Sequence, residues 1–292
     1  MASILDALIP RGEGHLPGRK TIGTGALFTP PQMTRAAYLR AARANGRAGG
    51  LAVAITVLAG WALSLYASLF SRAVADGPLA LRLMAVASTT WFHTALFITG
   101  HEAMHGLVSP GYPRINHAIG WFCTRAFAHL DYKTLLHAHW AHHRCPAQAG
   151  KDPDFHNGTH RGVIPWFATF MLGYMRVSQL AWMGASCALL AALTSPVRVL
   201  VGWVLPLLAS SVQLFFFGTY LPHRDPDLAS GKPYADRHRA RSEYGWSSQF
   251  HLLSCLNFGL HHEHHTMPYI PWWRLHTVRF DKVGAPPEVA SQ

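Results

Sequence analysis

Three clusters of histidine stand out in the sequence because their spacing could build a metal centre. They read His101-Glu-Ala-Met-His105, His139-Trp-Ala-His142-His143 and His261-His262-Glu-His264-His265. Residues three and four apart share one face of a helix, so each cluster presents two or three imidazoles in the same direction. One such pair is common by chance among 20 histidines, whereas three such clusters predict one shared metal centre.

The number of imidazoles indicates two metal ions rather than one. Eight histidines have the spacing of ligands: His101, His105, His139, His142, His143, His261, His264 and His265. Imidazole binds iron, zinc, copper or nickel, whereas structural zinc sites have four ligands and favour thiolates. His262 does not fit the H-x2-H-H spacing and is expected beside the ligands, and His137 fits it less well than His139. His223 follows the last apolar segment, and its position alone favours a structural or interfacial role.

Two features near the clusters leave alternatives open. His101-Glu102-Ala-Met-His105 also matches H-E-x-x-H, the zinc protease motif in which the glutamate is a general base. That interpretation needs only one further ligand and leaves six well-spaced histidines without a role, so we disfavour it. Asp152 and Asp154 follow the second cluster, and they fit equally a helix-capping turn and carboxylates that orient a ligand imidazole.

The composition points to a membrane protein. Half of the residues are hydrophobic and only 13% are charged, against about 25% in a soluble domain. Four apolar segments are long enough to cross a bilayer, at residues 51–70, 83–100, 164–193 and 199–220. Arg176 interrupts the third, and Pro206 is expected to kink the fourth. Short links at 71–82 and 194–198 join them into two helical hairpins.

The basic residues predict the orientation of these segments. The net charge of +11 comes mainly from residues 1–50, 101–163 and 221–292, which hold seven, six and eight of the 25 Lys and Arg residues. By the positive-inside rule these three segments, with the N- and C-termini, face the cytoplasm. Topology therefore accounts for the charge without a nucleic-acid partner. All three histidine clusters then lie on the cytoplasmic side.

The chain is expected to divide into an N-terminal segment and one membrane domain. Residues 1–50 form a cytosolic segment with an interfacial basic helix at 33–47, and residues 51–292 form the domain. Four widely spaced cysteines without a C-x-x-C motif are expected to be reduced thiols. A metal transporter would place its ligands at mid-membrane, whereas His93 is the only histidine within the four apolar segments.

Seven motifs, two of which contain the first and third histidine clusters, resemble those of a known family. They lie at residues 97–106, 152–156, 218–224, 235–242, 252–259, 261–265 and 271–275. The chain resembles the membrane fatty-acid desaturase and hydroxylase superfamily and, within it, the bacterial β-carotene ketolases. Thr219-Tyr-Leu-Pro-His-Arg224 and Pro271-Trp-Trp-Arg-Leu275 carry the likeness to ketolases. Glu102 departs from the family, whose first cluster usually has an aspartate there.

Together with the apolar segments, the resemblance implies an all-α integral membrane protein with four transmembrane helices in two hairpins. A cytosolic helical cap would carry a histidine-bound di-iron site, with His223 added to the eight ligands named above. Side chains next to the ligands would be Glu102, Asp152, Asp154 and His262. Side chains lining a substrate tunnel would be Phe92, Leu96, Phe97, Phe215, Phe216 and Phe217.

The implied reaction is a dioxygen-dependent oxidation in a bacterial inner membrane. It would convert the 4-position of a β-ionone ring to a ketone, with electrons from a ferredoxin-type reductant. The carotenoid would enter from the bilayer, and the products would be ketocarotenoids such as echinenone, canthaxanthin and astaxanthin. A carotenoid hydroxylase, a fatty-acid desaturase and an alkane hydroxylase share this ligand set and stay open as alternatives. A membrane protein that only binds or transports metal is a more distant one.

Overall fold

The computed structural model describes residues 33–46, 49–224 and 237–283, and the regular structure within these ranges is helical. One isolated bridge joins Ser242 to Leu260. The α-helices are α2 (Arg35–Gly46), α3 (Gly50–Phe70), α4 (Arg72–Ala75), α5 (Leu79–Met104), α6 (Pro113–Ala128), α7 (Tyr132–Arg144), α8 (Val163–Tyr174), α9 (Val177–Leu193), α10 (Pro196–Val199), α11 (Leu205–Phe215), α12 (Leu221–His223), α13 (Ser248–Cys255), α14 (His261–Thr266) and α15 (Phe280–Val283). Two π-helical turns, η2 (Leu200–Val204) and η3 (Phe216–Tyr220), and a 3-10 helix, η5 (Trp272–Thr277), complete them. The predicted all-α class is confirmed for this part of the chain.

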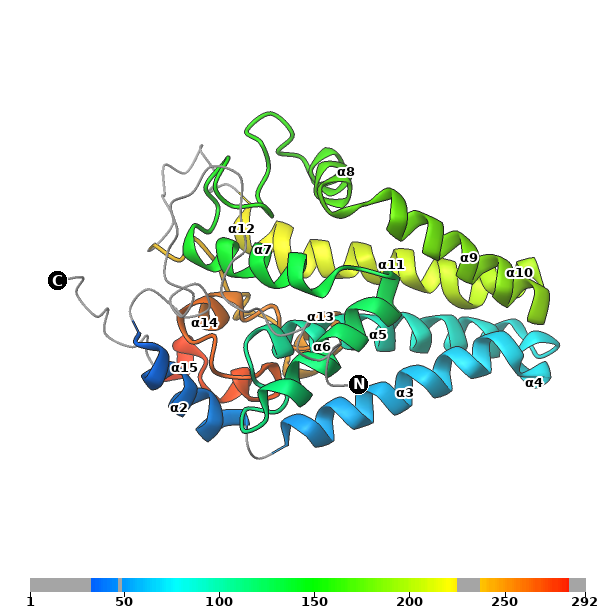
Figure 1. Ribbon diagram of the computed structural model, residues 1–292, viewed down its shortest axis with the longest axis horizontal. Helices are drawn as coiled ribbons and strands as arrows, with labels where there is room; N and C mark the ends of the chain where they lie inside the picture. Colours follow the sequence, from blue (N-terminus) through cyan, green and yellow to red (C-terminus); the bar gives the residue numbers. More distant parts are fainter. Residues whose placement is uncertain (1–32, 47–48, 225–236, 284–292) are drawn as a thin grey trace.

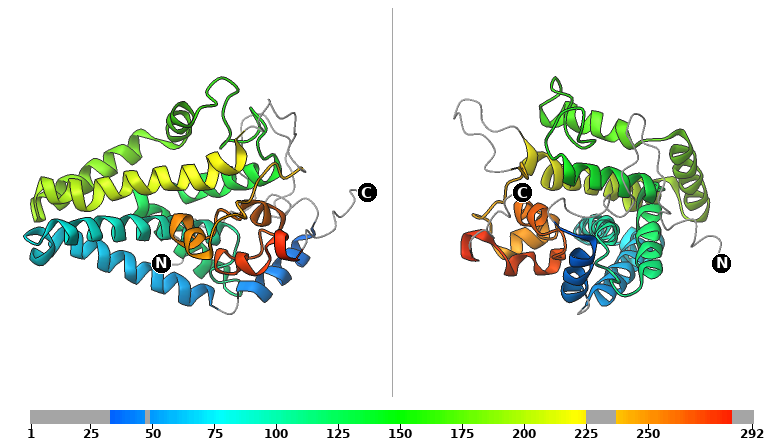
Figure 2. Two further views of the ribbon diagram at one scale, coloured as in Figure 1. Left: turned by 180° about the vertical axis from the view of Figure 1, so that it is seen from behind. Right: turned by 60° about the vertical axis from the view of Figure 1, so that its left-hand side comes forward.

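The long helices run side by side along the molecule (Figure 1). α3, α5 and α11 extend from the end where the short helices α4 and α10 turn the chain toward the end where α7, α12 and α14 gather, and the view from behind agrees (Figure 2). α9 runs beside them from the α10 end and covers only part of this length. α5 is the central helix, since it packs against α3, α6 and α11. α4 and α10 correspond to the two predicted hairpin links. The three histidine clusters therefore meet at the end opposite to these links.

Two helices are long and apolar enough to cross a membrane. They are Gly50–Phe70 and the continuous helix Pro196–His223, which combines α10, α11 and α12 with the two π-helical turns. α8 and α9 make a third only if the pair counts as one span, and they meet at an angle of 93°. α5 covers the predicted second span and has the length, but its sequence is less apolar. In the described ranges, length and composition thus support two or three of the four predicted spans.

Arg176 turns the predicted segment 164–193 into a bent pair of helices. Met175 and Arg176 are both extended, which ends α8 and begins α9. The Arg176 guanidinium donates a 3.0 Å hydrogen bond to the hydroxyl of Thr134, near the start of α7. The predicted interruption at Arg176 is therefore a break between two helices, and the Arg176 side chain has a partner outside the apolar segment.

A widened helical turn accommodates the proline expected to kink the last span. Pro206 follows the π-helical turn η2, in which the Leu205 N–H bonds the carbonyl of Leu200, five residues back. The extra residue in such a turn makes room for the proline ring, which otherwise clashes with the carbonyl four residues before it. Pro222 follows η3 in the same way. The helix thus continues through both prolines and ends at His223.

Candidate metal centre

Nine histidines, the full set predicted as ligands, converge where α5, α7, α12 and α14 meet. They come from α5 and the residue after it (His101, His105), from α7 (His139, His142, His143), from the end of α12 (His223) and from α14 (His261, His264, His265). Eight of them are buried and His139 is half-buried. The helical spacing that predicted the clusters therefore holds in three dimensions.

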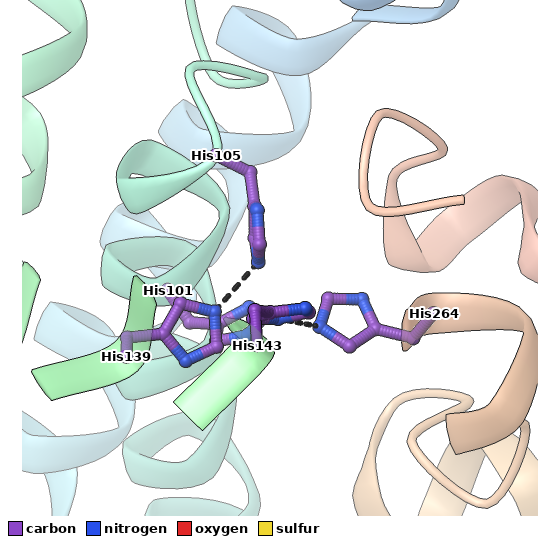
Figure 3. A group of neighbouring side chains, drawn as sticks. All are labelled: His101, His105, His139, His143 and His264. Carbon is purple, nitrogen blue, oxygen red and sulfur yellow. Dashed lines mark hydrogen bonds between the residues drawn. The ribbon is translucent and has the colours of Figure 1, made fainter. Parts of the chain in front are cut away.

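The first of two groups contains His101, His105, His139, His143 and His264, whose ligand atoms all lie within 4.8 Å of one another. Figure 3 shows their rings turned toward a common centre. The Nε2 atoms of His105 and His139 are 2.7 Å apart, and those of His143 and His264 are 3.1 Å apart. We call this set the five-histidine group.

The second group, the four-histidine group, contains His142, His223, His261 and His265, again with ligand atoms within 4.8 Å. The Nε2 atom of His265 lies 3.1 Å from Nε2 of both His142 and His261. His223 bonds the carbonyl of Arg239 through Nδ1 at 2.9 Å. Its ring also lies within about 5 Å of those of His142, His261 and His265, centroid to centroid. The structure therefore brings His223 to the other predicted ligands, although its position in the sequence alone favoured a structural role.

Both groups have the geometry of nitrogen ligands around an ion. Two imidazole nitrogens, each about 2.1 Å from one ion and at right angles, lie about 3 Å apart. The observed Nε2 separations match this distance, and Nε2 of His101 is buried without a hydrogen-bond partner among the described residues. A buried nitrogen lone pair without a partner is costly unless it binds something. The two groups thus fit two metal ions.

The surroundings of these imidazoles favour their neutral form, which is the form that binds a metal. Burial, followed by the neighbouring imidazoles, lowers the pKa of His105, His139 and His143 well below the ordinary value. His142 differs: burial acts to lower its pKa, but the Asp152 carboxylate outweighs burial and the net direction is upward. A neutral imidazole is the form that binds metal, so the low pKa values favour ligation at neutral pH.

The predicted carboxylates divide into two kinds. Asp152 is buried and accepts hydrogen bonds from Nδ1 of His142 at 2.9 Å and from the N–H of Ala147 at 2.8 Å. A carboxylate in this place orients the imidazole and directs its other nitrogen to the metal. Asp154 instead accepts from the hydroxyl of Tyr174. Asp152 thus makes hydrogen bonds of both kinds, within its own turn and to the imidazole of His142, and its orienting role stays a prediction.

Glu102 lies on the outer side of its histidine. Its Oε1 is 3.3 Å from Nδ1 of His101, whereas the neighbouring imidazoles approach one another through Nε2. The general base of an H-E-x-x-H protease faces the metal-bound water instead. The geometry therefore favours an orienting role and disfavours the protease interpretation. His262 lies outside both groups, with its ring 5.2 Å from that of Phe280, centroid to centroid.

The six residues predicted to line a substrate tunnel lie in different surroundings. Leu96 and Phe97 pack against Phe127 in the core between α5 and α6. The other rings contact residues elsewhere: Phe92 faces Trp91, Phe215 packs with Trp166 and Phe170, Phe216 stacks on Tyr220, and Phe217 meets Trp246. The structure does not bring the six into one wall, and their role stays a prediction.

Glu263, in the middle of the third cluster, was not predicted to matter. It is fully buried, and its carboxylate accepts hydrogen bonds from the Ser242 hydroxyl and from the N–H of Phe280 at 2.9 Å. The same Ser242 oxygen accepts from the N–H of His262 at 3.0 Å. Glu263 thus ties α14, which carries three of the candidate ligands, to two other segments. A charged residue flanked by histidines was the signal available in the sequence.

Removing the Glu263 carboxylate is expected to destabilise the protein. Glu263→Ala leaves the half-buried hydroxyl of Ser242 and the half-buried N–H of Phe280 without their acceptor, which costs at most about 1–3 kcal/mol for each group. Thermal unfolding of the purified protein in detergent should show a clear decrease in Tm. Glu263→Gln, which keeps one acceptor oxygen, serves as the control and should lose less. Equal Tm values for the wild type and Glu263→Ala would contradict this assignment.

Comparison with known proteins shows relatives along most of the chain. The Fatty acid desaturase family model matches residues 77–185 and 173–286. The beta-carotene ketolase of Haematococcus lacustris is 38% identical over 203 residues, 68% of this chain and 63% of that protein. The beta-carotene ketolase of a Paracoccus species is 37% identical over 247 residues, 81% of this chain and 95% of that protein. The zeaxanthin 4-ketolase of Chlamydomonas reinhardtii is 36% identical over 247 residues, 81% of this chain and 54% of that protein.

These matches differ in how much of each relative they cover. The chain spans 63% of the Haematococcus protein's length but almost all of the Paracoccus protein. The family match contains the three histidine clusters and extends over well more than half of the chain. The resemblance first seen in the motifs is therefore confirmed, and the chain belongs to the fatty acid desaturase family.

Proposed function

We propose that this protein is a carotenoid ketolase that oxidises the 4-position of a β-ionone ring to a ketone. The observation that carries the proposal is the pair of imidazole groups in a chain whose relatives are named as ketolases of β-carotene or zeaxanthin. Each hydroxylation would consume one dioxygen, two electrons and two protons, and release one water. A second hydroxylation at the same carbon gives a geminal diol, which loses water to leave the ketone.

One iron would be held by each group of histidines. Iron suits a site of neutral imidazoles without thiolates, and a redox-active metal is what an oxygenase needs. When bound, two irons would supply the activation of dioxygen that breaking an allylic C–H bond requires. The protein's own part is to hold nine imidazoles at fixed positions and to exclude water. Phe258 and Trp140 serve that exclusion, with rings 4.8 Å from His101 and 5.1 Å from His105, centroid to centroid.

The substrate and the electrons would reach the site from different sides. A carotenoid is soluble in the bilayer, so we propose four membrane crossings, by α3, α5, the bent pair α8 and α9, and the helix that ends at His223. The histidine end of the molecule, with both termini and residues 1–50, would then face the cytoplasm from a bacterial inner membrane. A ferredoxin-type reductant would approach this face. Residues 51–292 would form the membrane domain.

Pigment analysis tests this proposal. Cells that accumulate β-carotene and express the protein should produce echinenone and canthaxanthin, with a red-shifted absorption because a ring ketone extends the conjugation. Cells that express His264→Ala at the same level serve as the control and should keep β-carotene. Zeaxanthin alone would mean a ring hydroxylase. Unchanged β-carotene with new unsaturated fatty acids would mean a desaturase, and metal uptake without oxygen consumption would mean a transporter.

A further inference from the structure

The N-terminal helix α2 brings one buried side chain, Tyr38, to the point where the first and third histidine clusters meet. Tyr38 is 3% exposed. Its hydroxyl lies 3.0 Å from the carbonyl oxygen of His105 and 3.3 Å from that of Pro268. His105 closes the first cluster, and Pro268 follows the third. The single hydroxyl proton is therefore shared between two backbone carbonyls that are far apart in the sequence, with the shorter contact to His105.

The end of α5 explains why these carbonyls need partners. The last carbonyls of a helix have no N–H within the helix to bond. α5 ends at Met104, and Gly106 follows with a φ of +75°, a left-handed conformation that commonly ends helices. The indole N–H of Trp140 donates a hydrogen bond to the carbonyl of Met104 at 3.1 Å. The Tyr38 hydroxyl donates to the next carbonyl, that of His105. The two rings meet edge to face, 5.8 Å apart.

His105 lacks the partner at Nδ1 that orients His142 and His223. His142 is oriented through Nδ1 by Asp152, and His223 by a backbone carbonyl. Nδ1 of His105 is buried and makes no hydrogen bond within the described residues. His105 also lies beyond the last residue of α5, so the helix does not fix its backbone fully. The N–H of His105 still bonds the carbonyls of His101 and Glu102, whereas its own carbonyl depends on the Tyr38 hydroxyl. The Trp140 ring packs against its imidazole.

We propose that Tyr38 is a positioning residue of the metal centre: its hydroxyl fixes the backbone of His105 relative to the loop after α14. The inference rests on the proposed function, since it assumes that the five-histidine group holds an iron. It gives a role to the helix preceding the first apolar span, to which the sequence alone assigned no chemistry. Losing a partner that orients a ligand typically reduces metal affinity about 10–100-fold. Tyr38 acts through the backbone, so we expect the lower end of that range.

The rate of iron loss from the iron-loaded protein tests this role. Tyr38→Phe removes only the hydroxyl, and Tyr269→Phe is the matched control. Tyr269 packs 6.3 Å from Tyr38, ring to ring, and its hydroxyl makes no hydrogen bond to the described residues. Reduced, iron-loaded protein in detergent is mixed with excess ferrous chelator without oxygen. Tyr38→Phe should release iron about 10-fold faster than the wild type, and Tyr269→Phe at the wild-type rate.

Unfolding temperatures separate positioning from general stability. Metal that binds only the folded state raises Tm, and weaker binding makes that rise smaller. The difference in Tm between the iron-loaded and metal-free forms should therefore shrink in Tyr38→Phe and not in Tyr269→Phe. An equal decrease in both forms with an unchanged rate of iron release would overturn the role of Tyr38 alone. A wild-type protein that binds no iron would overturn the di-iron assignment, and this role with it.

Discussion

Replacing His264 with alanine is expected to abolish ketocarotenoid formation. The Nε2 of His264 is 3.1 Å from that of His143, and its ring lies 4.9 Å from those of His101 and His105, centroid to centroid. Replacing it with alanine removes one candidate ligand nitrogen from the five-histidine group. Turnover should fall by more than about a hundredfold, beyond the 10–100-fold cost of losing an orienting partner. Iron per chain should fall as well, while the amount of protein in the membrane stays the same.

His137→Ala provides the matched control for this variant. His137 lies on α7 with three of the candidate ligands, but it belongs to neither group. Its replacement should leave turnover within about twofold of the wild type, as is usual for substitutions away from a site. Pigment formation per amount of protein and elemental analysis of iron measure both effects. Full turnover by His264→Ala, or equal inactivity of both variants, would contradict the assignment.

Asp152→Asn is expected to lower turnover about 10–100-fold, the cost typical of removing a carboxylate that orients a ligand. The Asp152 side chain accepts from Nδ1 of His142 and from the N–H groups of Ala147 and Asp154. An amide offers one oxygen and one NH2 group in its place, so at least one of these donors would face another donor. The variant also loses the charge that holds the pKa of His142 up.

Asp154→Asn is the matched comparison, because it removes a second charge near His142 and leaves the hydrogen bond from His142 to Asp152 in place. Asp154 accepts from the Tyr174 hydroxyl and contacts no candidate ligand through a hydrogen bond among the described residues. Its neutralisation should therefore reduce turnover much less than that of Asp152. Both variants are compared by product formation and by iron per chain. Equal losses from the two substitutions would show that the Asp152-Pro-Asp154 turn matters as a whole rather than through the bond to His142.

Eight of the nine candidate ligands were predictable from the sequence because helical spacing is a local property, whereas His223 was added only by the family resemblance. Three and four residues bring side chains to one face, whatever the rest of the fold does. The division into two groups was not predictable, because it depends on how helices pack. His142 and His143 are neighbours on α7, yet His142 joins the four-histidine group and His143 the five-histidine group. Only the packing of α7 relative to α5, α12 and α14 decides which imidazole meets which partners.

The spans were predicted less well, because a hydropathy scale does not take into account that polar side chains can form hydrogen bonds inside the protein. Thr94 on α5 donates its hydroxyl to the side chain of Gln213 on α11 at 2.6 Å, and Ser68 and Thr89 pair at 2.8 Å. These polar groups lower the apolar character of α5 but are satisfied inside the protein. Tyr38 and Glu263 escaped prediction for a related reason, since their partners lie far away in the sequence.

Metal analysis of the protein purified from membranes tests the central claim most directly. Each imidazole group should hold one iron, so elemental analysis should find about two irons per chain and zinc well below one. The His264→Ala variant should contain less iron than the wild type when both are prepared in parallel. One zinc per chain without iron, or a wild-type protein that binds no iron even after reconstitution under reducing conditions, would contradict the account.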